Sequence, residues 1–259
     1  MKPRYGDVSA TVEGHVAVLE IDRPPNNHVT VDLVRDLADA LDDVDADPAL
    51  RVTLLLTAGR VFCGGADLVS PAGEGGSVVD STHALYAQAA RLFETKKPIV
   101  AAVQGAAIGA GLGLALAADF RIAAPEARFS ANFVKLGFHP GFGTTASLPR
   151  LVGRHRADLM FLTGRRIRAD EALAWGLVDD VTDLSGLRAD AMALAQELAE
   201  NAPLAVQATR ATLRAGLADE IRRQTDIEAA EQAKLRGTAD FAEGVRAVAE
   251  RRPGRFTGT

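Results

Sequence analysis

The stretch of residues 99–119, IVAAVQGAAIGAGLGLALAAD, constrains the fold of this chain more than any other part of the sequence. Ile99–Val103 is a short apolar run with β-branched residues, which predicts a strand. Gly109, Gly111 and Gly113 then open an Ala/Leu-rich segment without proline or charge, which predicts a buried helix. Glycines at a turn from strand to helix let a ligand approach the backbone, and the first N–H groups of a helix have no partners within it. This turn can therefore bind an anion.

Three interpretations of this stretch are open from its residues alone. One is a buried strand and helix whose glycines allow close packing. Another is a dinucleotide-binding turn, but the spacing is G-x-G-x-G rather than G-x-G-x-x-G, and no isolated acidic residue follows at the distance of a ribose contact. The third is an oxyanion hole, in which a backbone N–H stabilises the negative oxygen of an enolate or tetrahedral intermediate. An oxyanion hole needs a second donor from elsewhere in the chain.

A second glycine-containing loop can supply that donor. Residues 59–68, GRVFCGGADL, follow the segment RVTLLLT, which predicts a strand buried on both faces. Backbone N–H groups in such a loop can face a ligand, whereas the alternative is a plain tight turn at Gly64 and Gly65. Cys63 is expected to be a small core residue rather than a nucleophile, because no base is close to it in the sequence.

Composition predicts one large globular domain or a domain with an appendage. The chain has 259 residues, of which 47% are hydrophobic, and its net charge of -5 argues against nucleic acid or an anionic membrane as the main partner. A single cysteine excludes an internal disulfide and a cysteine metal cluster. Residues 99–118 are long enough for a membrane span, but their Ala and Gly content and central glycines argue against one. Because the N-terminus has no apolar signal-peptide core, we expect a cytoplasmic protein.

The rest of the chain mixes predicted strands and helices before it becomes entirely helical. Strands are expected at residues 15–22, 51–57, 120–123, 127–130 and 177–181, and helices at 31–44, 80–94, 144–151, 154–163 and 169–175. Four amphipathic helices are expected after them, at 187–200, 204–215, 219–235 and 239–250. Such a tail cannot make a large core alone, so we expect it to pack on its neighbour or on another subunit. Residues 132–143, rich in glycine and aromatic residues, are typical of a loop that lines a site.

Taken in order, several motifs resemble the crotonase (enoyl-CoA hydratase/isomerase) superfamily. The matching segments are RPPNNHVTVDLVRDLADAL from Arg23, FCGGADL from Phe62, KKPIVAAVQGAAIGAGLGLALAADFRIAA from Lys96, TGRRIRADEALAWGLVDDV from Thr163 and DFAEGVRAVAERRPGRF from Asp240. The resemblance implies an α/β crotonase (ClpP/crotonase-like) fold. It places repeated ββα units over residues 1–190 and a helical oligomerisation segment over residues 191–259. It also implies a homotrimer or a dimer of trimers.

The resemblance further implies the ligand and the residues that bind it. The ligand is an acyl-CoA thioester, and neither a separate cofactor nor a metal is expected. The two oxyanion-hole N–H groups fall on Ala66 and Ala110, and each such donor contributes about 3 kcal/mol to transition-state stabilisation. The loops that contact the thioester are expected to do so through Gly65, Ala66, Asp67, Leu68, Gly109 and Ala110.

The chain departs from this family at both positions where its hydratases carry a catalytic glutamate. These positions hold Gly113 and Phe133, and no acidic residue occurs within 104–118 or 127–143. In the second window only His139 is of a type that transfers protons near neutral pH, so it is a candidate catalytic residue or a histidine that packs in a turn. Asp67 is expected to cap the helix after its loop rather than to act as a base. Three further side chains can reach an acyl pocket: His28, His83 and Asp80.

These observations predict an enoyl-CoA hydratase/isomerase-family enzyme that holds a thioester carbonyl between the N–H groups of Ala66 and Ala110. Hydration is expected to be very slow, because both glutamate positions are replaced. The alternatives are a non-catalytic acyl-CoA-binding protein and an enzyme with one base, such as a double-bond isomerase or a thioester hydrolase.

Overall fold

The computed structural model describes residues 1–66 and 78–259 and is organised around a seven-stranded sheet. The strand order is β1 (Arg4–Tyr5), β2 (Val8–Glu13), β3 (Val16–Ile21), β4 (Val52–Thr57), β5 (Ile99–Val103), β7 (Phe120–Ala123) and β10 (Asp180–Val181). β1, β2 and β3 pair in antiparallel fashion, and every pair from β3 to β10 is parallel. A three-stranded sheet contains β6 (Ala106–Ile108), β8 (Arg128–Ser130) and β9 (Arg166–Arg168).

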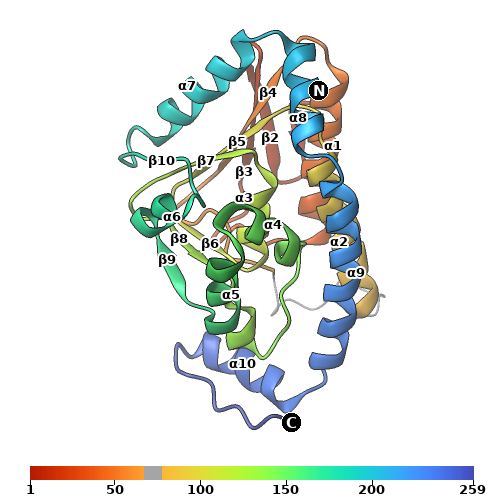
Figure 1. The fold of residues 1–259 in the computed structure, drawn as a ribbon, viewed down its shortest axis with the longest axis vertical. Coiled ribbons are helices and arrows are strands. Elements are labelled where there is room, and N and C mark those ends of the chain that lie inside the picture. The colour runs from red at the N-terminus through yellow and green to blue at the C-terminus, as the bar shows by residue number, and fades with distance from the viewer. Residues whose placement is uncertain (67–77) are drawn as a thin grey trace.

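Helices cover both faces of the large sheet, as the apolar sequences of β4 and β5 predict. Every residue of these two strands is buried. Alternate strand residues belong to two different clusters, one packed with α1 (Val31–Ala46) and α2 (Val78–Glu94), and the other with α7 (Leu187–Glu200). Figure 1 shows α7 on the opposite side of the sheet from α1 and α2. The boundary expected at residue 190 therefore falls inside a helix that completes the core.

The sequence explains both where the helix α1 begins and which of its faces is buried. The side chain of Thr30 accepts a hydrogen bond from the Leu33 N–H at 3.1 Å, which satisfies one of the free donors of the first turn. The buried side chains recur at helical spacing, and they pack on the sheet. They are Leu33, Val34, Leu37, Ala38, Ala40, Leu41 and Val44.

The helix α3 (Ala110–Ala117) lies at the centre of the molecule, and all of its residues are buried. The short strand β6, which the sequence analysis did not predict, separates it from β5. A Cβ atom at Gly111 would lie 2.2 Å from the carbonyl oxygen of Cys63, and one at Gly105 would lie 2.0 Å from the carbonyl oxygen of Arg60. Glycine is therefore needed at both positions, because the two predicted loops pack backbone against backbone.

The remaining helices lie around this centre, from the upper end of the molecule in Figure 1 to its lower end. They are η1 (Asn132–Leu136, a 3-10 helix), α4 (Thr144–Val152), α5 (Arg154–Thr163), α6 (Ala169–Trp175), α8 (Pro203–Leu213), α9 (Leu217–Leu235) and α10 (Ala239–Ala249). α9 packs against α2 and α4, and α10 packs against η1. None of the described helices combines the length and apolar character that crossing a membrane requires.

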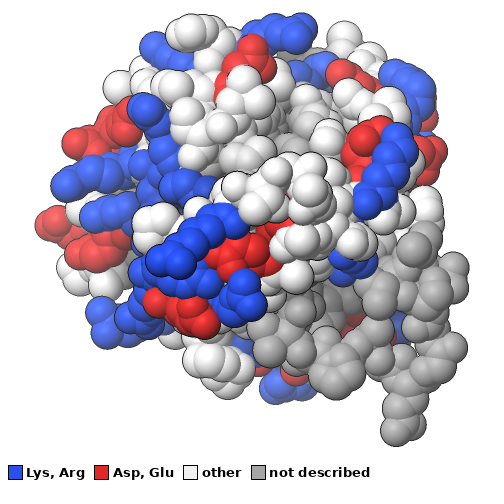
Figure 2. All heavy atoms as spheres, turned by 90° about the horizontal axis from the view of Figure 1, so that it is seen from below, with Lys and Arg blue, Asp and Glu red and all other residues white. Residues whose placement is uncertain are grey.

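The end of the molecule that carries α10 has mixed charge. Figure 2 shows Lys and Arg side chains interspersed with Asp and Glu side chains on the face seen from below. Within this region Glu243 pairs with both Arg246 and Arg252. The pair with Arg252 fastens the segment after α10 to the helix.

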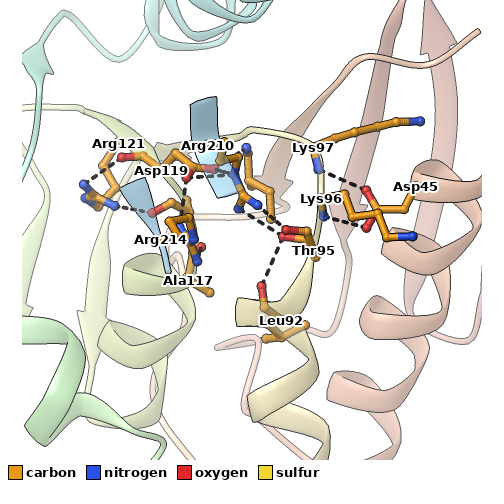
Figure 3. A network of polar contacts seen from close by, with 12 residues as sticks. Asp45, Leu92, Thr95, Lys96, Lys97, Ala117, Asp119, Arg121, Arg210 and Arg214 are labelled. Atoms are coloured by element: carbon orange, nitrogen blue, oxygen red, sulfur yellow. Dashed lines mark hydrogen bonds and ion pairs between the residues drawn. The ribbon is translucent and has the colours of Figure 1, made fainter. Parts of the chain in front are cut away.

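The helix α8 is tied to the core by ion pairs rather than by apolar contacts. Arg210 is its one residue classed as buried, and its Nε atom donates to Asp119 at 2.9 Å. Arg214 also donates to Asp119 at 2.9 Å (Figure 3). Asp119 further accepts from the Ile99 N–H at 2.9 Å. Leu204 and Leu213 of the same helix are more than two-thirds exposed, at 79% and 74%. These exposed apolar side chains are consistent with the expected oligomer, which stays a prediction.

Candidate functional site: a cavity at two backbone N–H groups

A cavity of about 310 Å³ lies where the two predicted oxyanion-hole loops meet α2, α9 and α10. Both predicted donors, Ala66 and Ala110, line it, together with Gly65 and Gly109. Its wall is mainly apolar and includes Phe133. The structure therefore brings together two loops that are about forty residues apart in the sequence. Asp67 and Leu68, also expected to contact the ligand, lie outside the described residues.

The N–H group of Ala66 faces away from the segment that precedes α1. Val29 and Ala66 form a parallel bridge, in which the Val29 N–H donates to the Gly65 carbonyl at 2.8 Å. In a parallel bridge the residue opposite Val29 makes no hydrogen bond to it, so the N–H of Ala66 points away from Val29. Gly65 has φ of +100°, and a Cβ there would lie 2.9 Å from the Ile108 carbonyl oxygen. Only glycine fits this position without strain.

The N–H group of Ala110 is the first of α3. Gly109 precedes the helix with φ of 56°, and its own N–H donates to the Ser130 carbonyl at 2.8 Å. The Ala110 N–H has no partner within its helix, as expected at a helix start, and no acceptor among the described residues. The positive end of the α3 dipole adds to its attraction for a negatively charged oxygen.

His28 supports the peptide that carries the Ala66 donor. Its Nδ1 atom lies 3.3 Å from the Gly65 carbonyl oxygen, and its Nε2 atom lies 3.3 Å from the side-chain nitrogen of Asn26. The Asn26 amide is a donor, so these contacts assign the ring proton to Nδ1. The Gly65 carbonyl then accepts two hydrogen bonds, which polarise the peptide and strengthen its N–H as a donor. His28 was predicted only to be able to reach the pocket, and the structure places it in the cavity wall.

Aromatic rings occupy the region where the family's hydratases carry two glutamates. Phe133 lines the cavity, and a Cβ at Gly113 would lie 2.6 Å from the Cδ1 atom of Phe142. Phe142 is fully buried and has φ of 64°, a conformation that is uncommon for a residue other than glycine. The described residues that line the cavity include no Asp or Glu. The ring of Phe142 therefore fills the space beside Gly113.

A buried polar cluster from α2 and α9 holds the loop that carries Phe142. Glu228 is fully buried and accepts hydrogen bonds from the N–H groups of Gly143 at 2.7 Å and Thr145 at 3.1 Å. Gln232 donates to the His139 carbonyl at 2.8 Å and accepts from the Tyr86 hydroxyl at 2.7 Å. Burial raises the pKa of the Glu228 carboxyl and of the Tyr86 phenol, so the phenol stays protonated at neutral pH.

This cluster was not predicted from the sequence. Glu228 and Gln232 are one helical turn apart in α9, and both are buried in an otherwise amphipathic pattern. The one local signal for this cluster is two polar residues on the face of the helix that points into the protein. Their partners on α2 and before α4 are far away in the chain, so nothing local identifies them.

The other candidate side chains lie outside the cavity wall or outside the described residues. His139 is not among the described residues that line the cavity, and its Nδ1 atom lies 2.8 Å from the Pro140 carbonyl oxygen. His83 is exposed on α2, and the side chain of Asp80 is not described. The catalytic role of His139 thus stays a prediction. Cys63 is the core residue that was predicted, since it is fully buried and burial raises the pKa of its thiol to about 12.

This chain is similar in sequence and in fold to known proteins. The family model of enoyl-CoA hydratase/isomerase matches residues 11–259. A putative enoyl-CoA hydratase of Thermus thermophilus is 38% identical over 94% of this chain and 98% of its own length. The 1,2-epoxyphenylacetyl-CoA isomerase of Escherichia coli is 36% identical over 95% of this chain and 97% of its own. The crystal structure of an enoyl-CoA hydratase/isomerase from Pseudoalteromonas atlantica superimposes with a TM-score of 0.87 at 32% identity, covering 97% of this chain and 100% of that one. From the fold, the paired backbone loops and these similarities we conclude that this chain belongs to the enoyl-CoA hydratase/isomerase (crotonase) family.

Proposed function

We propose that this protein binds a CoA thioester with the thioester carbonyl oxygen between the N–H groups of Ala66 and Ala110. The observation that carries the proposal is that both groups border one cavity while neither has an acceptor among the described residues. A backbone donor held away from water without a partner costs free energy, and a carbonyl oxygen supplies the missing acceptor. The donation strengthens as the oxygen gains negative charge, so the site favours an enolate over the bound thioester.

The reaction that we propose is double-bond isomerisation, in which a base removes a proton from C2, the carbon beside the thioester carbonyl, and returns it to C4. The double bond then moves from C3 to C2. Hydration needs one group to deprotonate water and another to deliver a proton, and each contributes about 10² to 10⁴-fold. Gly113 has no side chain and Phe133 offers an apolar ring, so this pair is missing from the positions where the family's hydratases carry it. Relatives named as hydratases and as an isomerase have similar sequence identity to this chain, so overall identity does not indicate the reaction. The residues of the site therefore decide between hydration and isomerisation.

His28 is the base that we propose for this proton transfer. Among the described residues of the cavity wall it is the one histidine, the residue type that most often serves as a general base. Its Nε2 atom is held by Asn26 at 3.3 Å, a long contact that the ring can give up when a substrate binds. The Nδ1–H group keeps its hydrogen bond to the Gly65 carbonyl. The same side chain therefore supports the Ala66 donor through Nδ1 and transfers the substrate proton through Nε2.

A non-catalytic acyl-CoA-binding protein is the second candidate. Phe142 fills the space beside Gly113, and Phe133 lines the cavity, while both backbone donors remain. A chain that kept binding and lost proton transfer would show this combination.

One panel measured in two ways separates the candidates. Binding of crotonyl-CoA, 3-butenoyl-CoA and butyryl-CoA is followed by calorimetry, and turnover of the same compounds by chromatography. We expect binding of all three, conversion of the 3-enoyl to the 2-enoyl thioester, and hydration at least a hundredfold slower than isomerisation. Loss of isomerisation in His28→Gln with binding retained supports the base. Binding without any turnover favours the second candidate, and the absence of binding rejects both.

A further inference from the structure

One wall of the cavity carries a cation that no described carboxylate neutralises. Arg236 follows the last turn of α9, is half-buried and lines the cavity beside Gln232 and Tyr86. Two cations of the same helix have acidic partners: Arg222 pairs with Glu94 at 2.6 Å, and Lys234 pairs with Glu231 at 2.6 Å. The guanidinium of Arg236 forms no ion pair within residues 1–66 and 78–259, and no described oxygen accepts from it. Its charge is therefore available to a ligand.

Two aromatic rings fix the position of this guanidinium. Its central carbon lies 5.0 Å from the ring centre of Phe138 and 5.5 Å from that of Phe241, and the two rings are 4.8 Å apart. Contact with an aromatic face restrains a guanidinium while its N–H edge stays free to form two parallel hydrogen bonds. Burial lowers the pKa of Arg236, but an arginine side chain remains charged in proteins. The wall thus presents a positioned donor edge, not a mobile surface charge.

The surroundings of Arg236 favour an anion carried by an acyl group over a phosphate of CoA. The wall around it is apolar and includes Val245, Val248 and Ala249 of α10. An unpaired charge in such surroundings costs free energy, and a planar carboxylate matches the guanidinium in shape and sign. A phosphate dianion is more strongly hydrated and fits an open basic surface better. The hydroxyl of Tyr86 and the amide of Gln232 already bond to each other, which leaves Arg236 as the charged group for the ligand.

We propose that Arg236 binds a carboxylate carried by the acyl group, so that the preferred ligands are CoA thioesters of dicarboxylic acids. This inference rests on the proposed binding of a CoA thioester in the same cavity. It assigns a substrate class that an apolar acyl pocket would exclude. It also makes Arg236 a residue that determines specificity through binding, without a part in proton transfer.

The test compares pairs of thioesters with equal carbon number. Dissociation constants are measured by calorimetry for succinyl-CoA and butyryl-CoA, glutaryl-CoA and pentanoyl-CoA, and adipyl-CoA and hexanoyl-CoA, with free CoA as a reference. In the unchanged protein we expect the acidic member of at least one pair to bind about tenfold more tightly, the effect of a charge-assisted pair of hydrogen bonds. The preference should shrink as salt is added.

Two variants and one matched control assign the preference to Arg236. Arg236→Met keeps an unbranched side chain that packs on the rings, and it should abolish the preference while the neutral thioester binds as before. Arg236→Lys keeps the charge without the planar edge and should retain part of the preference. Arg223→Met removes an exposed charge from the same helix and should change nothing.

Each contrary result has a distinct meaning. Equal affinity for both members of all three pairs in the unchanged protein overturns the inference, whether or not the variants fold. If Arg236→Met loses the same amount of affinity for every thioester and for free CoA, the arginine binds a phosphate of CoA. This result also overturns the inference. Failure of every thioester to bind rejects the proposed function itself.

Discussion

Replacement of Gly113 by alanine tests whether Phe142 truly occupies the place of a catalytic side chain. The added Cβ would lie 2.6 Å from Cδ1 and 3.0 Å from Cβ of Phe142, whereas carbon atoms in contact are about 3.5–4.0 Å apart. Phe142 is fully buried, so it cannot move away freely. Overpacking of this kind costs about 1–3 kcal/mol, and alanine in a helix regains about 1 kcal/mol over glycine. We therefore expect a net loss of about 1 kcal/mol in the free energy of unfolding.

The assay is urea unfolding at one fixed protein concentration, because association would otherwise change the apparent stability. Gly237→Ala is the control, since no described atom lies within 4 Å of a Cβ at that position. In a Phe142→Leu background the clash is relieved, so Gly113→Ala should be neutral or stabilising, and the two changes should be coupled. A gain of about 1 kcal/mol from Gly113→Ala alone, without coupling to Phe142, would refute the reasoning. It would mean that the space beside Gly113 is open.

Three further outcomes follow from buried and paired groups. The raised pKa of Cys63, about 12, should keep the native thiol unreactive toward a disulfide reagent at pH 8, and rapid labelling before unfolding would contradict this. Asp119→Ala leaves Arg210 without its carboxylate and should cost about 3–5 kcal/mol of stability, so a loss below about 1 kcal/mol would argue against the ion pair. Hydrogen bonds from Arg252 hold the pKa of Glu243 well below 4.5, so its contribution is present above pH 4.5 and is lost as the pH falls through the folded value. Glu243→Gln should therefore flatten the acid limb of the stability profile, and an unchanged limb would count against this pair.

Local patterns predicted most of the secondary structure, because hydrophobic spacing and glycine positions act over one element at a time. The helices α4, α5, α6 and α7 lie within a residue of their expected bounds. Short strands such as β6 and β9 were missed, since three residues give no period and their formation depends on pairing with β8. The amphipathic pattern of α7 was also ambiguous. The same pattern fits a helix that packs on its own sheet and one that packs on another subunit.

Residues of the site that belong to local motifs could be predicted from the sequence, and contacts between distant segments could not. Ala66 and Ala110 were predicted as donors from local glycine-rich motifs, and the structure places both in one cavity, while their role stays a prediction. The contact of Phe142 with Gly113 and the bond from Tyr86 to Gln232 join distant parts of the chain. No spacing rule in a single sequence reveals such contacts. The substitution of both glutamate positions was visible in the sequence, but the ring that fills the space beside one of them was not.

The carbonyl stretching frequency of a bound thioester tests the central claim most directly. Butyryl-CoA labelled with ¹³C at the thioester carbonyl is measured by infrared difference spectroscopy, free and bound to the protein. We expect a shift to lower frequency on binding, because two N–H donors draw electron density toward the oxygen. Ala110→Ser keeps the N–H and should retain the shift, whereas Ala110→Pro removes it at the first position of α3, where proline is tolerated, and should reduce the shift. A bound thioester whose carbonyl frequency equals that of the free compound would contradict the account.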